Sequence, residues 1–236
     1  MLGITIPDLL GLLVFLAAWL GYHFFVERSY TGRHGLNSLM NQQRVIWMQR
    51  MADRDARIVD ASIMAALQSG TAFFASTSLF AIGAATALLR YADDALKIFE
   101  DLPFAATPSR SLWEIKSIGL MIIFIYAFFK FSWSYRLFNY SAILIGATPM
   151  PGKETEALRR VAALRAAEMN VVASRHFNRG QRAFFFALAY LGWFVTPYLL
   201  IVATVGVLYV MWARQYTSEA LRAVTLELDT FDGDNS

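Results

Sequence analysis

Long apolar runs, separated by clusters of charge, constrain this chain more than any other feature. The runs cover residues 6–26, 70–89, 112–136 and 183–212. A helix needs about 20 mostly apolar residues to cross the hydrocarbon of a bilayer, and each run is long enough. Charged residues make up 17% of the sequence, against about 25% in soluble domains. The pattern predicts an all-α membrane protein with four transmembrane helices.

Basic residues gather in two of the three connections between the runs. Residues 27–69 carry six arginines and residues 147–182 carry seven basic residues, whereas residues 90–116 carry four basic and five acidic residues. Cytoplasmic loops of membrane proteins are enriched in Lys and Arg. We therefore expect the first and third connections to face the cytoplasm of an inner membrane. With four spans, both termini would lie on the outer, periplasmic side.

The two basic connections have the periodicity of amphipathic helices, which we predict over residues 36–69 and 153–182. The third apolar run continues without a proline to residue 147. Its last part, residues 137–145, is too apolar to stand bare in water. We expect the amphipathic helices to cover it, which would form a cytoplasmic helical bundle continuous with the membrane bundle.

The third span contains one basic residue whose depth decides how the helix sits. At about 1.5 Å per residue, Lys130 lies roughly 24 Å and Arg136 roughly 33 Å along the helix from Glu114. A hydrocarbon core of about 30 Å then ends between them. Lys130 at mid-membrane is the alternative, but an unpaired charge there costs several kcal/mol, so we favour the cytoplasmic interface.

Smaller signals bear on particular residues. Thr5 and Asp8 have capping-box spacing at the start of the first span. The hydroxyl residues 76–78 could line a polar path, although such residues more often let helices pack closely. Pro197 predicts a static kink in the fourth span rather than a gating hinge. Residues 1–222 are expected to form a single membrane domain, and residues 223–236 a flexible acidic tail.

Five segments are distinctive in combination. They are residues 54–61 (RDARIVDA), 73–77 (FFAST), 130–140 (KFSWSYRLFNY), 144–147 (LIGA) and 176–183 (HFNRGQRA). With them the chain, from about residue 8 to about residue 222, resembles the uncharacterised membrane family catalogued as domain of unknown function 599. The resemblance implies an all-helical membrane fold. It implies no activity and no catalytic residues.

Basic and amide side chains are predicted to converge at the cytoplasmic boundary. They could bind an anion or an anionic lipid headgroup, since basic residues there attract anionic lipids. The alternative, which we favour, is that they set the topology and pair with nearby carboxylates such as Asp53, Asp55, Asp60 and Glu168. The candidate cluster comprises Arg54, Arg57, Lys130, Arg136, Asn139, His176, Asn178, Arg179 and Arg182.

The sequence carries no sign of catalysis. It has no cysteine, its three histidines lack metal-ligand spacing, and no nucleophile motif is present. We therefore expect no enzyme, no cofactor, no metal and no nucleic acid partner. The favoured interpretation is a non-catalytic structural or accessory membrane component, with membrane lipids, copies of itself or another membrane protein as partners. The alternative is an oligomeric channel or transport-related protein with a basic cytoplasmic vestibule.

Overall fold

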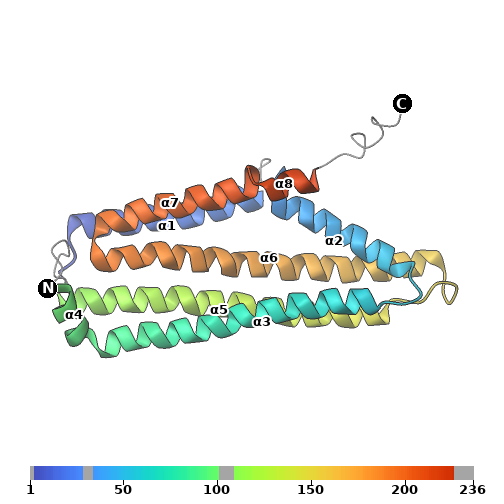
Figure 1. The fold of residues 1–236 in the computed structure, drawn as a ribbon, viewed down its shortest axis with the longest axis horizontal. Helices are drawn as coiled ribbons and strands as arrows, with labels where there is room; N and C mark the ends of the chain where they lie inside the picture. The colour runs from blue at the N-terminus through green and yellow to red at the C-terminus, as the bar shows by residue number, and fades with distance from the viewer. Residues whose placement is uncertain (1–2, 29–33, 101–108, 226–236) are drawn as a thin grey trace.

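The computed structural model describes residues 3–28, 34–100 and 109–225, and these residues form eight α-helices and no strand. The long helices lie side by side along the long axis of the molecule (Figure 1). The all-helical prediction is confirmed. The helices are α1 (Ile6–Arg28), α2 (Leu36–Ala52), α3 (Ile58–Arg90), α4 (Ala92–Glu100), α5 (Arg110–Ala147), α6 (Glu156–Val195), α7 (Pro197–Tyr216) and α8 (Glu219–Val224).

Four of these segments are long and apolar enough to cross a membrane, which agrees with a membrane protein. Three lie in α1, α3 and α5, and the fourth is the segment Pro197–Val224. α1 begins as its sequence predicts. The Thr5 hydroxyl donates to Asp8 Oδ2 at 2.6 Å, and the Thr5 backbone N–H donates to the same oxygen at 3.1 Å.

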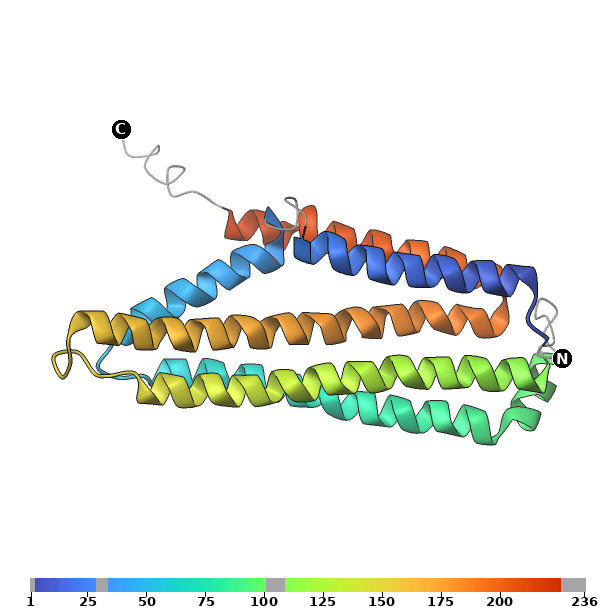
Figure 2. The same cartoon turned by 180° about the vertical axis from the view of Figure 1, so that it is seen from behind.

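Helix α6 is the centre of the bundle, with α5 on one side and α1 and α7 on the other (Figure 2). Two apolar cores follow it. The first contains large buried aromatic side chains, among them Phe15, Phe131 and Phe186. The second covers the extension of α5 with residues of α2 and α6, including Met48 and Met51 against the α5 residues. The predicted bundle around residues 137–145 is therefore present, while its place in the cytoplasm stays a prediction.

Residues 183–212 do not form one helix, which corrects the predicted fourth span. α6 ends at Val195, and α7 begins at Pro197 and runs back along α6. Thr196 caps α7, because its hydroxyl accepts the Leu199 backbone N–H at 3.0 Å. Proline suits the first position of a helix, where its missing N–H is not needed. Pro197 thus starts a helix and does not kink one.

This reversal changes where the chain ends up. α7 runs parallel to α1, since Gly11 lies against Pro197 at one end and the rings of Phe25 and Tyr216 are 6.1 Å apart at the other. The start of α1 and the end of α7 are therefore at opposite ends of the bundle. The prediction of both termini on one side required a single helix over residues 183–212 and does not fit this arrangement.

The predicted helix over residues 36–69 is also divided, at residues 53–57, although no proline or glycine lies there. The break lets the chain reverse so that α2 packs on α6 and buries Met48 and Met51. Asp60, in the first turn of α3, is fully buried and accepts from Trp47 Nε1 at 2.7 Å. The predicted helix over 153–182 instead continues to Val195 within α6. Of the predicted acidic tail, residues 226–236 lie outside the described residues.

Candidate functional site

Two adjoining pockets that contain arginine and amide side chains lie where α1 gives way to α2. The first, which we call the Arg44 cavity, has a volume of about 250 Å3 and lies between α2, α3, α5 and α6. The second, the Arg182–Arg214 pocket, has a volume of about 110 Å3 and lies between α1, α2, α6 and α7. Asn37 and Asn178 line both. The two pockets are therefore neighbours that share two amide side chains at this end of α1.

Arg44 is the most constrained charge in this region. Its guanidinium donates to the buried Asn170 side-chain oxygen and lies 6.0 Å from the centre of the Phe138 ring. Among the described residues it has no ion pair, and its Nε is buried without a hydrogen-bond partner. Burial lowers the pKa of the Arg44 guanidinium, although arginine stays charged in proteins. The cavity therefore holds a partly buried positive charge among neutral groups.

The polar partner of Arg44 is fixed from the core side. Asn170 is fully buried on α6, and its side-chain nitrogen donates to Ser141 Oγ at 3.2 Å. Ser141 in turn donates to the Ala166 carbonyl at 3.1 Å. A connected chain of this kind holds the acceptor for Arg44 in one orientation, because every member is satisfied by the next.

The Arg182–Arg214 pocket carries two further guanidinium groups and several amides. Arg214 stacks over the Phe185 ring at 5.4 Å, which turns its guanidinium toward α6. Gln215 is only 6% exposed, and its side-chain nitrogen is buried without a hydrogen-bond partner among the described residues. Gly35 permits this placement, since a Cβ there would come within 2.3 Å of the Gln215 nitrogen.

Both pockets suit an anion. Guanidinium and amide N–H groups are the donors that bind phosphate and carboxylate oxygens. No carboxylate is present among the described residues that line either pocket. Three arginines, Arg44, Arg182 and Arg214, therefore line a region whose described lining residues include hydrogen-bond donors and no carboxylate.

Only two of the predicted site residues, Asn178 and Arg182, line these pockets. His176 and Arg179 lie on the same stretch of α6 but are not among the residues that line them. Sequence reasoning missed Arg44, which had been treated only as a topological charge. The signal was its position four residues from both Met40 and Met48, on the apolar face of α2.

Arg54 and Arg57 lie away from the pockets, at the turn between α2 and α3. Arg54 Nη1 is 2.6 Å from the buried carboxylate of Asp60, as the pairing alternative expected. Arg57 donates to the carbonyls of Ile145 at 2.9 Å and Thr148 at 2.6 Å, at the end of α5. These two arginines therefore hold the turn between α2 and α3 against the start of α3 and the end of α5.

The remaining predicted residues are on α5 and do not join the pockets either. Lys130 Nζ lies 5.0 Å from the centre of the Tyr126 ring. Arg136 donates to the Tyr140 hydroxyl at 2.6 Å. Asn139 accepts from Gln68 Nε2 at 2.7 Å. The predicted convergence of all nine residues is thus not what the structure shows.

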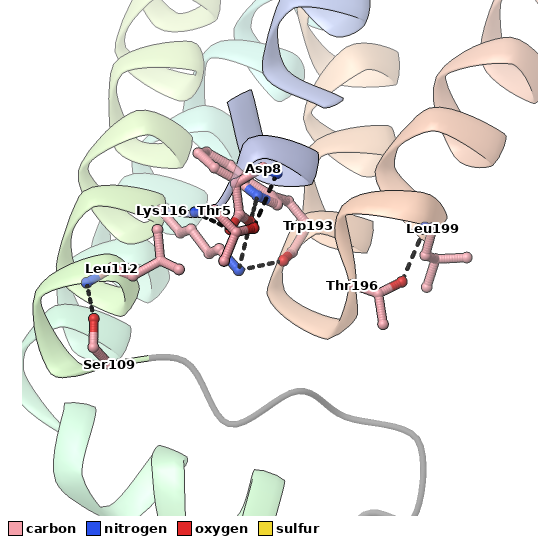
Figure 3. A network of polar contacts seen from close by, with 8 residues as sticks. All are labelled: Thr5, Asp8, Ser109, Leu112, Lys116, Trp193, Thr196 and Leu199. Carbon is pink, nitrogen blue, oxygen red and sulfur yellow. Dashed lines mark hydrogen bonds and ion pairs between the residues drawn. The ribbon is translucent and has the colours of Figure 1, made fainter. Parts of the chain in front are cut away.

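A second polar network closes the opposite end of the bundle (Figure 3). Lys116 and Asp8 are each 3% exposed, with Lys116 Nζ and Asp8 Oδ1 4.0 Å apart. Trp193 serves both, because its indole N–H donates to Asp8 Oδ1 at 2.8 Å and its carbonyl accepts from Lys116 at 2.7 Å. The network ties α1, α5 and α6 together and is saturated with partners, so it is structural. Among the described residues no group of His, Asp and Glu could hold a metal ion.

The fold defines the class, an all-helical protein with four segments long and apolar enough to span a membrane. Its family is also clear: the family model described as a protein of unknown function, DUF599, matches residues 10–220, so the chain belongs to that family. The resemblance seen in the sequence is confirmed. No curated protein and no solved structure gives a significant match.

Proposed function

We propose that this protein is a non-catalytic integral membrane component that binds an anionic group, a phosphate or a carboxylate, in the paired pockets at the end of α1. The observation that carries the proposal is the partly buried guanidinium of Arg44, which meets only neutral partners among the described residues. A partly buried charge loses hydration that neutral partners replace only in part. A bound anion would compensate for that loss and would explain why the donors converge.

The placement in the membrane is part of the same proposal. The arginine-rich connection that contains α2 and the turn between α5 and α6 would face the cytoplasm of an inner membrane. The pockets would then open at the inner interface, where anionic lipid headgroups and soluble anions are both present. Copies of the same chain or another membrane protein remain candidate partners.

The packed interior supports this function over a channel through one copy. Large side chains such as Phe131 and Phe186 are fully buried along the axis. Thr77 and Ser78 of α3, which could have lined a path, donate to the Phe73 and Phe74 carbonyls of their own helix at 2.8 Å. These hydroxyls need no water to satisfy them.

The test is a thermal-shift titration of the detergent-purified protein with inorganic phosphate and, separately, with short-chain phosphatidic acid. Ligand that binds only the folded state raises the unfolding temperature, so we expect stabilisation of the natural protein. Arg44→Gln should abolish it. The matched control is Arg160→Gln, which removes an exposed charge on α6 and should leave it intact. A response to phosphatidic acid alone would identify a lipid headgroup, and a response to both would identify a free anion.

Equal responses of natural protein and Arg44→Gln would overturn the proposal. So would the absence of any response in both, if the two proteins unfold at the same temperature without ligand.

A further inference from the structure

A long apolar groove runs between α1 and α5, with α6 as its floor. Its volume is about 630 Å3, more than twice that of the Arg44 cavity. Figure 2 shows α6 between the two helices that form the walls. The walls are Leu12, Phe15, Leu16, Trp19, Leu20 and His23 of α1 and Ile115, Ile118, Gly119, Ile122, Ile123 and Tyr126 of α5, above Tyr190 and Trp193 of α6.

The floor of the groove approaches α5 closely at one residue, Gly119. A Cβ on Gly119 would come within 2.0 Å of the Tyr190 hydroxyl, so only glycine lets the tyrosine lie there. The wall residues Ile118 and Ile122 are 41% and 58% exposed, so the groove is open along its side. α1 and α5 are both apolar enough to span a membrane. The open side would therefore face lipid.

The size of the groove argues against a helix as its occupant. From Leu12 to His23 the groove extends about 16 Å, at 1.5 Å per residue. A helix of a second copy or of a partner would be about 30 Å long to cross the bilayer, so the groove is only about half as long as such a helix. A single hydrocarbon chain is much narrower and has no backbone polar groups to satisfy.

One end of the groove is polar and basic. His23 lies 15 residues beyond Asp8 on α1, and Lys130 lies 14 residues beyond Lys116 on the parallel helix α5. Because Asp8 and Lys116 are paired, His23 and Lys130 lie at nearly the same depth, about 21–22 Å from that pair. Lys130 sits over the ring of Tyr126, which lines the groove. This end is the one that the basic connections place at the cytoplasmic interface.

We propose that the groove holds one acyl chain of an anionic phospholipid of the inner leaflet, with the headgroup beside Lys130 and His23. The chain contributes apolar burial, and the ammonium contributes attraction for the phosphate. The groove shares no lining residue with either of the paired pockets: Trp19 and His23 of α1 line the groove, whereas Tyr22 and Val26 line the Arg182–Arg214 pocket. The lipid site therefore stands or falls independently of the anion site.

The experiment is native mass spectrometry of the delipidated protein titrated with phosphatidylglycerol and with phosphatidylcholine. We expect the natural protein to retain one phosphatidylglycerol preferentially. Ile122→Trp fills the open side of the groove and should reduce that retention about tenfold, the effect of losing about 1.4 kcal/mol of binding. The control is Val202→Trp, the same kind of change at an exposed position of α7 outside the groove.

Lys130→Gln tests the contribution of the lipid headgroup separately from that of the acyl chain. It should lower retention of phosphatidylglycerol about fivefold, to the level of phosphatidylcholine, because one basic residue at the interface attracts an anionic lipid by about that factor. Circular dichroism and the unfolding temperature confirm that each variant is folded. Equal retention by Ile122→Trp and Val202→Trp would overturn the lipid site, as would an Ile122→Trp protein that loses a dimer while keeping its lipid. Arg44→Gln should leave phosphatidylglycerol in the groove unchanged.

Discussion

Lys116 shows how one residue joins three helices. Its ammonium donates to the Trp193 carbonyl in the last turn of α6, where the helix leaves carbonyls without partners, and it faces Asp8 in the first turn of α1. Both positions also suit the helix dipoles, since a cation lies at a C-terminus and a carboxylate at an N-terminus. The burial of both charges is tolerable because each is paired and hydrogen-bonded.

Replacing one member of this pair should therefore cost far more than replacing both. We expect Lys116→Met to destabilise the protein by about 3–5 kcal/mol, because it strands the Asp8 carboxylate. The double variant Asp8→Asn with Lys116→Met should recover most of that loss. Unfolding temperatures in detergent measure the cycle.

Lys97→Met, the same change at an exposed lysine, should cost about 0.5 kcal/mol or less and serves as the control. Equal losses at Lys97 and Lys116 would show that the buried pair contributes nothing.

At the scale of elements, the turn between α6 and α7 was the feature that hydropathy obscured. Residues 183–212 are continuously apolar, but a helix over all of them would be about 45 Å long, well beyond a hydrocarbon core of about 30 Å. That excess, together with Thr196 before Pro197, is the signature of a helix start. The break between α2 and α3 has no such signal, because the packing of Met48, Met51 and Asp60 causes it.

The cap at Thr196 predicts a measurable contribution to stability. Thr196→Val keeps the shape of the side chain but removes the acceptor for the Leu199 backbone N–H. We expect a loss of about 0.5–2 kcal/mol, seen as a lower unfolding temperature. Thr196→Ser retains the hydroxyl and should stay close to the natural protein. A Thr196→Val protein as stable as Thr196→Ser would mean that the turn does not depend on this cap.

At the scale of the whole molecule, the sequence predicted the helical class, the apolar spans and the second core, but not the number of passes along the bundle. α6 was not predicted as a separate pass because its second half carries Arg179 and Arg182. Other helices surround this half, so it needs less apolar surface than a helix exposed to lipid. The candidate site was predicted only in part, for a related reason. Charge showed which residues could gather, whereas the direction of each side chain depended on tertiary packing.

The five passes predict opposite sides for the two ends of the described chain. The natural sequence has no cysteine, so a maleimide can label only the single cysteine that each variant introduces. With a membrane-impermeant maleimide on intact cells, Asp94→Cys should label, while Lys153→Cys and Glu219→Cys should label only after permeabilisation. All three positions are exposed. Labelling of Glu219→Cys together with Asp94→Cys would restore the four-span arrangement and contradict the reversal at Thr196.

The central place of α6 also bears on how the protein is made. Its apolar part, residues 183–195, is shorter than the roughly 20 residues by which the insertion machinery recognises a span. As it leaves the ribosome, α6 is therefore a poor candidate for entering the bilayer on its own. The turn at Thr196 joins it to the strongly apolar α7, so we expect the two helices to insert as a pair. The last step of biogenesis would then complete the core and both binding regions at once.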